Sequence, residues 1–257
     1  MMRRAPLLLL DVGNTHTHVG LGDARRTRVL GEFPTASWLS GGAAAALRDL
    51  LGPARPSSGG FCSVVPAVND SVRATLGSEF GFEPRQLTSD TVREVGIRYP
   101  KPHTIGQDRL ANAVAARHHH GAPVLVVDFG TAVTFDVVDR HGDYVGGIIA
   151  PGLSAMTDYL HEKTALLPRI RIREPRSVIG RSTEQAMLAG AVHGYRGLVR
   201  GLIQELRREL GVRQLPVIAT GGYASLIARR LPEIDAVVPG LTLEGVRLFL
   251  VGDGLKG

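Results

Sequence analysis

Two stretches of the chain repeat one arrangement of an acidic residue, a glycine and hydroxyl side chains. Residues 7–21 read LLLLDVGNTHTHVGL, and residues 124–139 read VLVVDFGTAVTFDVVD. Each begins with a continuous apolar run, typical of a strand buried on both faces, and each run ends at an acidic residue, Asp11 or Asp128. A glycine follows two residues later, where the backbone can turn sharply and approach a ligand.

Hydroxyl and amide side chains follow each of these turns. They are Asn14, Thr15 and Thr17 after the first turn, and Thr131 and Thr134 after the second. A carboxylate beside a glycine turn lined with backbone N–H groups can hold a hydrated cation against polyphosphate. One such turn could simply end a buried strand. Because the turn occurs twice in the same context, we interpret the pair as a phosphate clamp of a nucleotide-binding protein.

A double glycine closes a later apolar strand at Thr220–Gly222. This TGG segment lets a flat ring and a ribose lie against the backbone, although such a segment by itself usually marks a turn. With the two acidic turns it completes a nucleotide site of two phosphate loops and a nucleoside loop. The sequence contains neither a P-loop motif nor a Gly-x-Gly-x-x-Gly motif after a strand, so the P-loop and Rossmann classes are excluded.

The length and composition fit a globular protein of two domains. The chain has 257 residues, of which 44% are hydrophobic and 21% charged. The spacing of the repeated turn divides it into halves of similar size, and we expect domains at 1–118 and 119–257. Each half is long enough to bury its own core.

The chain is basic, with a formal charge of +6. Nearly all of the 30 basic residues are arginines, and they are scattered along the sequence. Aromatic residues make up only 5% of the chain, so the interleaved basic and aromatic pattern of a nucleic-acid groove is missing. Attraction to small polyanions such as nucleotides explains the charge equally well, and we expect no nucleic-acid partner.

Cys62 is the only cysteine, which excludes an internal disulfide and a cysteine-based zinc site and fits a reducing compartment. The start of the chain, MMRRAPLLLLDVG, imitates a secretory or twin-arginine signal, but Asp11 interrupts its apolar stretch. We interpret it as the first strand. No run approaches the roughly 18 apolar residues of a membrane span, so we expect a cytoplasmic protein with no membrane partner.

The pattern of apolar and turn residues predicts a similar element order in each half. For the first half we expect strands at His18–Leu21, Arg28–Phe33 and Phe61–Pro66, helices at Gly41–Leu51 and Asn69–Leu76, a short strand near Gln86–Ser89, a loop at Tyr99–Gly106 and a helix at Asp108–His120. For the second half we expect a strand at Tyr144–Ile149, helices at Leu153–Lys163 and Thr183–Leu210, a strand at Pro216–Thr220, and helices at Ala224–Leu231 and Thr242–Leu250.

Helix ends are marked at two places. Three consecutive histidines, His118 to His120, precede Gly121. Successive helical residues point about 100° apart, so these imidazoles cannot converge on one metal ion, and we interpret them as a helix C-terminus capped by Gly121. Ser182 and Gln185 have the spacing of a capping box at the start of the long helix.

Seven motifs in a fixed order resemble one family. DVGNT, SVVP, YPKPHTIGQDR, DFGTAVTFD, GGIIAPGL, IGRST and ATGG, which lie between residue 7 and about residue 230, closely resemble the motifs of type III pantothenate kinases. That family is part of the acetate kinase, sugar kinase, Hsc70 and actin superfamily. The resemblance implies an α/β fold of two duplicated ribonuclease-H-like domains with a nucleotide cleft between them, and a homodimer.

The resemblance also implies an activity and its cofactors. The reaction is ATP-dependent phosphorylation of pantothenate to 4'-phosphopantothenate, the first step of coenzyme A biosynthesis. It implies ATP with Mg²⁺ and a monovalent cation, K⁺ or NH₄⁺. Two alternatives stay open: another small-molecule kinase of the superfamily, against which only YPKPHTIGQDR argues, and a non-catalytic transcriptional accessory factor, a label that this family has also carried.

Site residues carry over from the family motifs to this chain. The resemblance implies ATP contacts at Asp11, Val12, Gly13, Asn14, Thr15, His16, Thr17, His18 and Thr131, substrate contacts at Tyr99, Gly106, Gln107, Asp108, Arg109 and Thr183, a cation ligand at Asp128, and Asp108 as the proton acceptor. The family usually has Asn where this chain has His16. Thr183 would be contributed across the dimer, although a hydroxyl at a helix start usually caps the helix.

The residue chemistry agrees with the role implied for Asp108. A primary hydroxyl loses its proton as it attacks the terminal phosphate, and in a loose transition state an ordinary carboxylate can accept that proton late. Arg109 could hold the carboxylate of pantothenate through a charge-assisted fork. The other interpretation is an Asp that stabilises a helix N-terminus beside a solvated Arg.

Overall fold

The computed structural model describes residues 6–252, which divide by their contacts into two compact units. The first unit holds the described residues of Met1–Gly121, Gly142–Val145 and Gly240–Gly257, and the second holds Ala122–His141 and Gly146–Pro239. The contacts group the end of the chain with its beginning. The domains expected from the sequence, 1–118 and 119–257, stay a prediction. Part of the signal-like start, residues 1–5, lies outside the described residues.

The first unit is built on one main sheet. Its strands are β1 (Leu7–Val12), β2 (His16–Gly22), β3 (Thr27–Pro34), β4 (Ser58–Ser63) and β5 (Arg85–Gln86). The order is β3-β2-β1-β4-β5. β1, β2 and β3 form an antiparallel meander, whereas β4 runs parallel to β1 and β5 parallel to β4. Leu8, Leu9 and Leu10 of β1 are fully buried, so both faces of this apolar run are covered.

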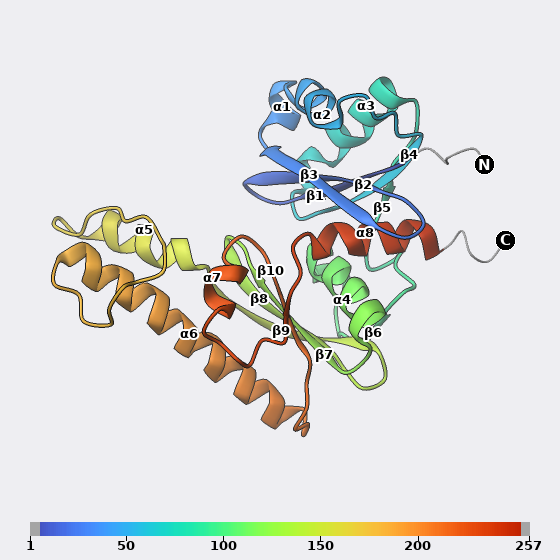
Figure 1. Cartoon of the computed structure of the whole chain (residues 1–257). Coiled ribbons are helices and arrows are strands. Elements are labelled where there is room, and N and C mark those ends of the chain that lie inside the picture. The colour runs from blue at the N-terminus through green and yellow to red at the C-terminus, as the bar shows by residue number, and fades with distance from the viewer. Residues whose placement is uncertain (1–5, 253–257) are drawn as a thin grey trace. The chain divides into compact units, whose positions relative to one another are not determined.

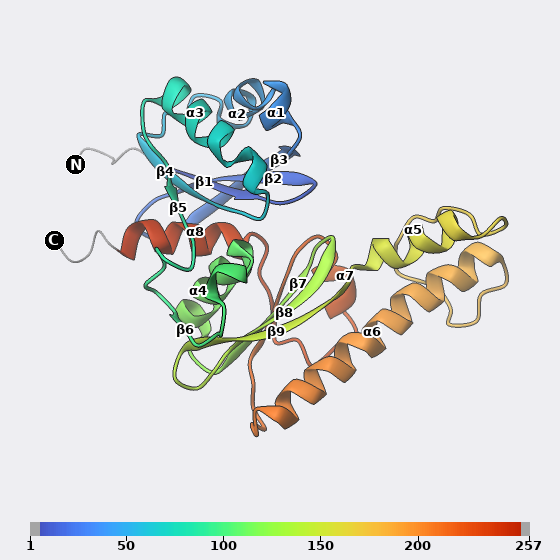
Figure 2. The same cartoon turned by 180° about the vertical axis from the view of Figure 1, so that it is seen from behind.

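Helices cover both faces of this sheet. They are α1 (Ser37–Ser40), α2 (Ala43–Leu51), α3 (Asn69–Phe80), α4 (Gln107–His120) and α8 (Leu241–Gly252), with short 3₁₀ turns at Pro66–Val68 and Pro102–Thr104. Figures 1 and 2 show α1, α2 and α3 on one face and α8 on the other. Trp38, Leu47 and Leu76 pack with Leu8 and Phe61 in a buried cluster, which forms the core on the α1–α3 side.

The last helix, α8, packs closely against α4. A Cβ atom at Gly245 would lie 1.9 Å from the carbonyl oxygen of Ala111, so only glycine permits this approach. The buried Thr242 hydroxyl donates to Oδ1 of Asn112 over 2.9 Å. These contacts explain why the end of the chain belongs to the first unit.

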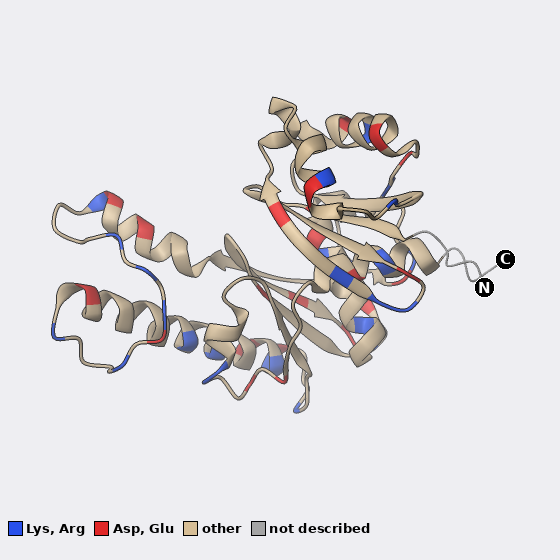
Figure 3. Ribbon diagram, turned by 45° about the horizontal axis from the view of Figure 1, so that its top comes forward, with Lys and Arg blue, Asp and Glu red and all other residues tan. Residues whose placement is uncertain are grey.

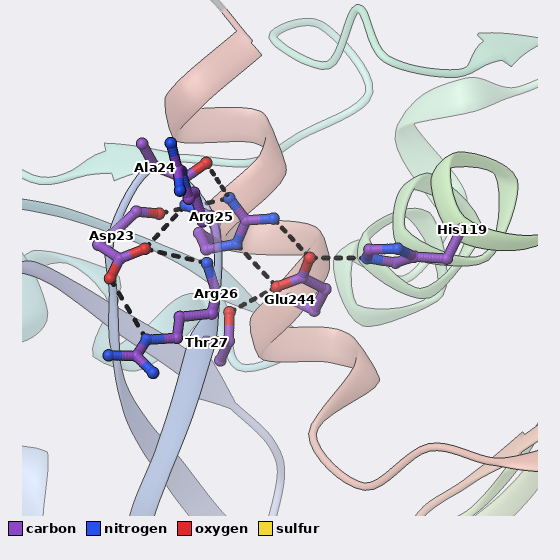
Figure 4. Close-up of polar contacts among 8 residues, drawn as sticks. Asp23, Ala24, Arg25, Arg26, Thr27, His119 and Glu244 are labelled. Atoms are coloured by element: carbon purple, nitrogen blue, oxygen red, sulfur yellow. Dashed lines mark hydrogen bonds and ion pairs between the residues drawn. The ribbon is translucent and has the colours of Figure 1, made fainter.

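A polar network around Glu244 links α8 to the β2–β3 turn and to the end of α4 (Figure 4). Glu244 accepts hydrogen bonds from Arg247 and from the Thr27 hydroxyl, and the His119 ring lies 2.8 Å from its Oε1 atom. Burial opposes ionisation of Glu244, but hydrogen bonds from Arg247, Thr27 and His119 outweigh it and lower the pKa of this carboxyl. α4 ends at His120 as expected, and Gly121 has a φ of 77°.

The second unit repeats the topology of the first. Its strands are β7 (Val124–Phe129), β8 (Ala132–Val138), β9 (Asp143–Pro151), which begins in the first unit, β10 (Val217–Thr220) and β11 (Ala236–Val237). Their order, β9-β8-β7-β10-β11, corresponds strand by strand to β3-β2-β1-β4-β5. The duplication expected from the two acidic turns is therefore confirmed. The unexpected strand β6 (Gly96–Ile97) pairs in parallel with Asp143 and Tyr144.

Three helices accompany the second sheet. They are α5 (Leu153–Lys163), α6 (Thr183–Glu209) and α7 (Ala224–Ala228). Figures 1 and 2 show α5 and the first part of α6 extending beyond the sheet, and Figure 3 shows Lys and Arg along the segment between them. Several apolar side chains of this region are exposed, among them Leu166 at 89% and Ile179 at 77%. None of the helices within residues 6–252 has the length and apolar character needed to cross a bilayer.

One strand boundary differs from the sequence-based expectation for a clear reason. We expected this strand at Phe61–Pro66, but β4 spans Ser58–Ser63. A Cβ atom at Gly59 would lie 2.4 Å from the carbonyl oxygen of Leu8. A glycine before Phe61 thus lets β4 approach β1 closely, which the composition of this segment does not reveal.

Candidate active site

The first acidic turn joins β1 to β2 at the edge of the first sheet. The N–H of Gly13 donates to the carbonyl oxygen of His16 over 3.1 Å and closes the turn. Asn14, Thr15 and His16 are exposed at its tip, whereas Val12 is fully buried. The exposed tip is the part of the predicted ATP-contacting stretch that a ligand can reach.

The buried Thr17 side chain supports this turn from the interior of the first unit. It is fully buried, its hydroxyl accepts from the Trp38 indole N–H over 2.9 Å, and it lies 3.1 Å from the Thr35 hydroxyl. Thr35 in turn donates to the carbonyl oxygen of Gly13 over 2.7 Å. The contact of Thr17 with ATP stays a prediction, while its hydroxyl already holds the turn in place. The sequence gives no signal that Trp38 and Thr35 support this turn.

Four polar or titratable side chains form a row across the first sheet. Asp11 pairs with His18 on β2 and with Cys62 on β4, and His18 pairs with Glu32 on β3. Directly paired residues of neighbouring strands point to the same face. His18 Nδ1 lies 3.1 Å from Glu32 Oε2. Burial lowers the pKa of His18, Glu32 opposes that shift, and His16 lowers the pKa further.

Cys62 lies beside the carboxylate of Asp11. Its Sγ atom is 3.5 Å from Asp11 Oδ1, and its side chain is fully buried. Burial, together with the negative charges of Asp11 and Asp108, raises the pKa of the Cys62 thiol well above its ordinary value. Both acidic residues that the sequence singled out in this unit therefore lie near one neutral thiol, and Cys62 had not been assigned to the site.

Asp108 occupies the first turn of α4. A Cβ atom at Gly106 would lie 2.6 Å from Asp108 Oδ1, so the carboxylate folds back over this glycine and would have to move if the residue were larger. Asp108 Oδ1 accepts a hydrogen bond from the N–H of Arg109 over 2.8 Å. Burial raises the pKa of Asp108, against the opposing effects of that hydrogen bond and of the Arg109 charge. A carboxylate with a raised pKa is a better proton acceptor than an ordinary one.

Two tyrosines accompany Arg109. Its guanidinium lies 5.9 Å from the ring centroid of Tyr144, and the rings of Tyr144 and Tyr99 are 6.3 Å apart. Tyr144 is fully buried, and Tyr99 is 37% exposed. Tyr144 was expected in a strand but not in the site, because no local pattern indicates that it would lie beside Arg109 on α4.

The second acidic turn carries a set of oxygen atoms. Asp128 pairs with Thr134 on β8 and with Thr220 on β10, so the three side chains point to one face. Gly221 has a φ of 90°, and a Cβ atom there would lie 2.5 Å from Asp128 Oδ1. The TGG segment, expected from the sequence to hold a nucleoside, therefore also lies against the predicted cation ligand.

Thr131 is exposed at the turn between β7 and β8. A Cβ atom at Gly152 would lie 2.2 Å from its carbonyl oxygen, so this glycine lets the start of α5 approach the turn. The closing glycine of the GGIIAPGL motif is thus explained by a close backbone approach.

Thr183 is the first residue of α6 and is exposed. Ser182 caps this helix, because its hydroxyl accepts from the N–H of Gln185 over 3.2 Å. Gln185 Oε1 accepts in return from the N–H of Arg181 over 2.9 Å. The Ser182 half of the expected capping box is confirmed, whereas the Gln185 side chain bonds to the N–H of Arg181 and not to that of Ser182. Since Ser182 provides the cap, the Thr183 hydroxyl is not needed for it.

Solved structures share the duplicated fold. An inorganic polyphosphate/ATP-glucomannokinase from Arthrobacter sp. strain KM matches with a TM-score of 0.50 and 18% identity, over 99% of this chain and 100% of that one. A Campylobacter jejuni protein assigned to the Baf family of transcriptional activators matches with a TM-score of 0.62 and 15% identity, over 98% and 100%. Such low identities show the fold alone. The chain has the paired ribonuclease-H-like architecture of the sugar kinase class.

Sequence comparison narrows this class to one family. The family model of type III pantothenate kinase matches residues 7–205. A type III pantothenate kinase from Methylacidiphilum infernorum (isolate V4) is 46% identical over 251 residues, which cover 95% of this chain and 87% of that protein. The chain belongs to the type III pantothenate kinase family. It is therefore a kinase that phosphorylates pantothenate in coenzyme A biosynthesis.

Proposed function

We propose that Asp108 accepts the proton of the pantothenate hydroxyl as that hydroxyl attacks the terminal phosphate of ATP. The observation that carries this assignment is the half-buried carboxylate at the start of α4, whose pKa is raised by burial. A carboxylate of raised basicity accepts a proton more readily. The 4'-phosphopantothenate formed then leaves with its new phosphate ester bond, and ADP is released.

The residues around Asp108 hold pantothenate. Arg109, fixed above the Tyr144 ring, binds the carboxylate of pantothenate, since a guanidinium fork matches a carboxylate in charge and geometry. The full set of proposed substrate contacts is Tyr99, Gly106, Gln107, Asp108, Arg109 and Thr183. Tyr99 supplies a partly exposed aromatic face beside this cluster.

ATP contacts come from both acidic turns. Residues Asp11 to His18 supply backbone N–H groups and the exposed side chains of Asn14, Thr15 and His16, and Thr131 supplies a hydroxyl. His16 can donate one hydrogen bond to phosphate, although it lacks the paired donor and acceptor of an amide. The carboxylate of Asp11 suits Mg²⁺, which prefers hard oxygen ligands and, with ATP, neutralises phosphate charge.

The substrate assignment is tested by measuring ADP release with Mg²⁺ and ATP, with and without pantothenate. We expect release to depend on pantothenate and to be slight with other primary alcohols, because the Arg109 cluster recognises a carboxylate. Equal release with an alcohol that lacks a carboxylate would favour another kinase specificity of the superfamily. A DNA-binding titration at physiological salt checks the regulatory alternative, since nonspecific binding collapses with salt.

We further propose that Asp128 binds the monovalent cation, K⁺ or NH₄⁺. The carboxylate and the hydroxyls of Thr134 and Thr220 on the same face form an all-oxygen donor set, which suits such a cation. Asp128→Asn should therefore weaken activation by K⁺ more than it weakens folding. Turnover of the wild type should differ between K⁺ and Na⁺, whereas the variant should treat them alike, with a similar melting temperature. A wild type that shows no cation preference would refute the proposal.

The enzyme acts as a homodimer in the cytoplasm. The exposed apolar side chains near α5 and the start of α6, among them Tyr159, Leu166 and Ile179, form a surface that association with a second copy would cover. A single buried cysteine fits the reducing interior of a cell. The oligomeric state can be measured by sedimentation, and substitution of Leu166 by Glu should favour monomers.

A further inference from the structure

A chain of hydrogen bonds links the Asp108 helix to three other elements of the first unit. Oε1 of Gln107, the first residue of α4, accepts from the N–H of Ser63 at the end of β4 over 2.9 Å. The same oxygen accepts from Nε2 of Gln86 on β5 over 3.1 Å. Oε1 of Gln86 accepts from Nη2 of Arg73 on α3 over 2.8 Å.

The far end of this chain is itself fixed. Nη1 of Arg73 donates to Glu83 Oε1 over 2.8 Å and to the carbonyl oxygen of Pro84 over 3.2 Å. The guanidinium also lies 5.4 Å from the ring centroid of the fully buried Phe61. Arg73 therefore has little freedom, and it determines which way the Gln86 amide faces, because only the amide oxygen can accept from a guanidinium.

The orientation of Gln86 determines that of Gln107. Because the side-chain oxygen of Gln86 accepts from Arg73, its NH₂ group faces Gln107. Gln107 must then accept through its own side-chain oxygen. That oxygen also accepts from the N–H of Ser63, which lies past the part of β4 that is paired with the short strand β5. Gln107 thus replaces a strand partner for β4 and ties the start of α4 to the sheet.

We propose that Arg73, Gln86 and Gln107 form a positioning relay that sets the place of the neighbouring Asp108 carboxylate for proton transfer. The inference rests on the proposed role of Asp108 as the proton acceptor. It assigns the side-chain oxygen of Gln107 to this relay, so that a contact of Gln107 with pantothenate comes from its other atoms. Small displacements of a catalytic group can cost much of its effect, which makes a residue two steps away important for rate.

The relay can be tested at Gln86, which the proposed mechanism does not otherwise use. Gln86→Leu removes both links, whereas Gln86→Glu keeps an acceptor for Arg73 and loses the donor to Gln107. Both variants should lower kcat by about tenfold and leave the KM for ATP unchanged, because Asp108 is misplaced while the ATP-binding turn is intact. Gln86→Glu should keep a melting temperature closer to that of the wild type. Gln214→Leu, at an exposed position, is the matched control and should change neither value.

A double-variant comparison separates positioning from general damage. In an Asp108→Asn background the proton acceptor is absent, so adding Gln86→Leu should lower kcat by less than about twofold. An equally large loss in both backgrounds would overturn the proposal, because the relay would then act on something other than Asp108. Unchanged kcat in both Gln86 variants of the wild type would also overturn it.

Amide hydrogen exchange tests the hydrogen bonds of the relay without measuring activity. Its result therefore does not depend on the role of Asp108. Gln107→Leu should raise the hydrogen-exchange rate of the Ser63 amide by roughly tenfold or more, since the amide loses its acceptor. The Val64 amide, which donates to the carbonyl oxygen of Val12 over 3.0 Å, should be unaffected. Unchanged exchange at Ser63 would show that the link does not exist. Faster exchange together with a fully active Asp108→Asn enzyme would instead reject the base assignment.

Discussion

Replacement of Asp108 by Asn should lower kcat by roughly 10² to 10⁴, the usual range for removing a general base, while the affinity for ATP stays close to that of the wild type. Asn keeps the size of the side chain and can still accept the hydrogen bond from the N–H of Arg109, but it cannot take a proton. Steady-state kinetics with pantothenate and a separate nucleotide-binding titration provide the two quantities.

The matched control for this substitution is Asp70→Asn. Asp70 lies in the first turn of α3, as Asp108 lies in the first turn of α4, so both changes remove a negative charge from a helix N-terminus. The control should leave kcat within a few-fold of the wild type. If Asp108→Asn behaves like the control, Asp108 only stabilises its helix and the base is another residue.

The pH dependence gives a second test of the same assignment. Only the ionised carboxylate can accept the proton, so kcat/KM should fall as the pH falls through the pKa of Asp108, and burial places that pKa above the ordinary aspartate value. The Arg109 charge lowers this pKa, so Arg109→Met should move the acid limb to higher pH. An acid limb unchanged in position would mean that a different group controls it.

Mixing two inactive variants should restore activity if Thr183 reaches the pantothenate of a second copy. Asp108→Asn and Thr183→Ala homodimers should each be poorly active, but a mixed dimer has both lesions in one site and neither in the other. Half of randomly exchanged dimers are mixed, so roughly a quarter of all sites should become intact. The exposed position of Thr183 and the cap supplied by Ser182 make its hydroxyl available for such a contact.

Subunit exchange must be established independently in that experiment, for example by differently tagged chains that purify together. Recovery near a quarter of wild-type activity would demonstrate a shared site. Absence of recovery, once exchange is shown, would mean that Thr183 serves its own subunit or takes no part in catalysis. A mixture of Asp108→Asn with wild type should show no gain beyond the contribution of the wild-type sites.

Local patterns predicted the elements whose stability depends on neighbouring residues in the chain. α5 has the bounds expected from the sequence, and α6 begins at Thr183, where a capping serine precedes an amphipathic run. The two acidic turns were visible because each is a short continuous segment between a buried strand and the next strand. Shared strand order then confirmed that they are repeats.

Contacts between distant segments could not be predicted in this way. β6 has only two residues, too few for a periodic pattern, yet it pairs with Tyr144, whose ring lies beside Arg109. The sequence does not indicate that the side-chain oxygen of Gln107 accepts from the N–H of Ser63 at the end of β4, because this bond depends on where β5 ends.

The sequence by itself determined the duplicated α/β fold, the two acidic turns and the motif that contains Asp108 and Arg109, because each is encoded in a continuous stretch. Only the tertiary structure decided how these residues are supported: Thr17 by Trp38, Asp11 by Cys62, and the start of α4 by Gln86. It also decided that α8 packs in the first unit, through a glycine that meets the backbone of Ala111. Such contacts join residues far apart in the chain, and their formation depends on the packing of whole elements rather than on any local pattern.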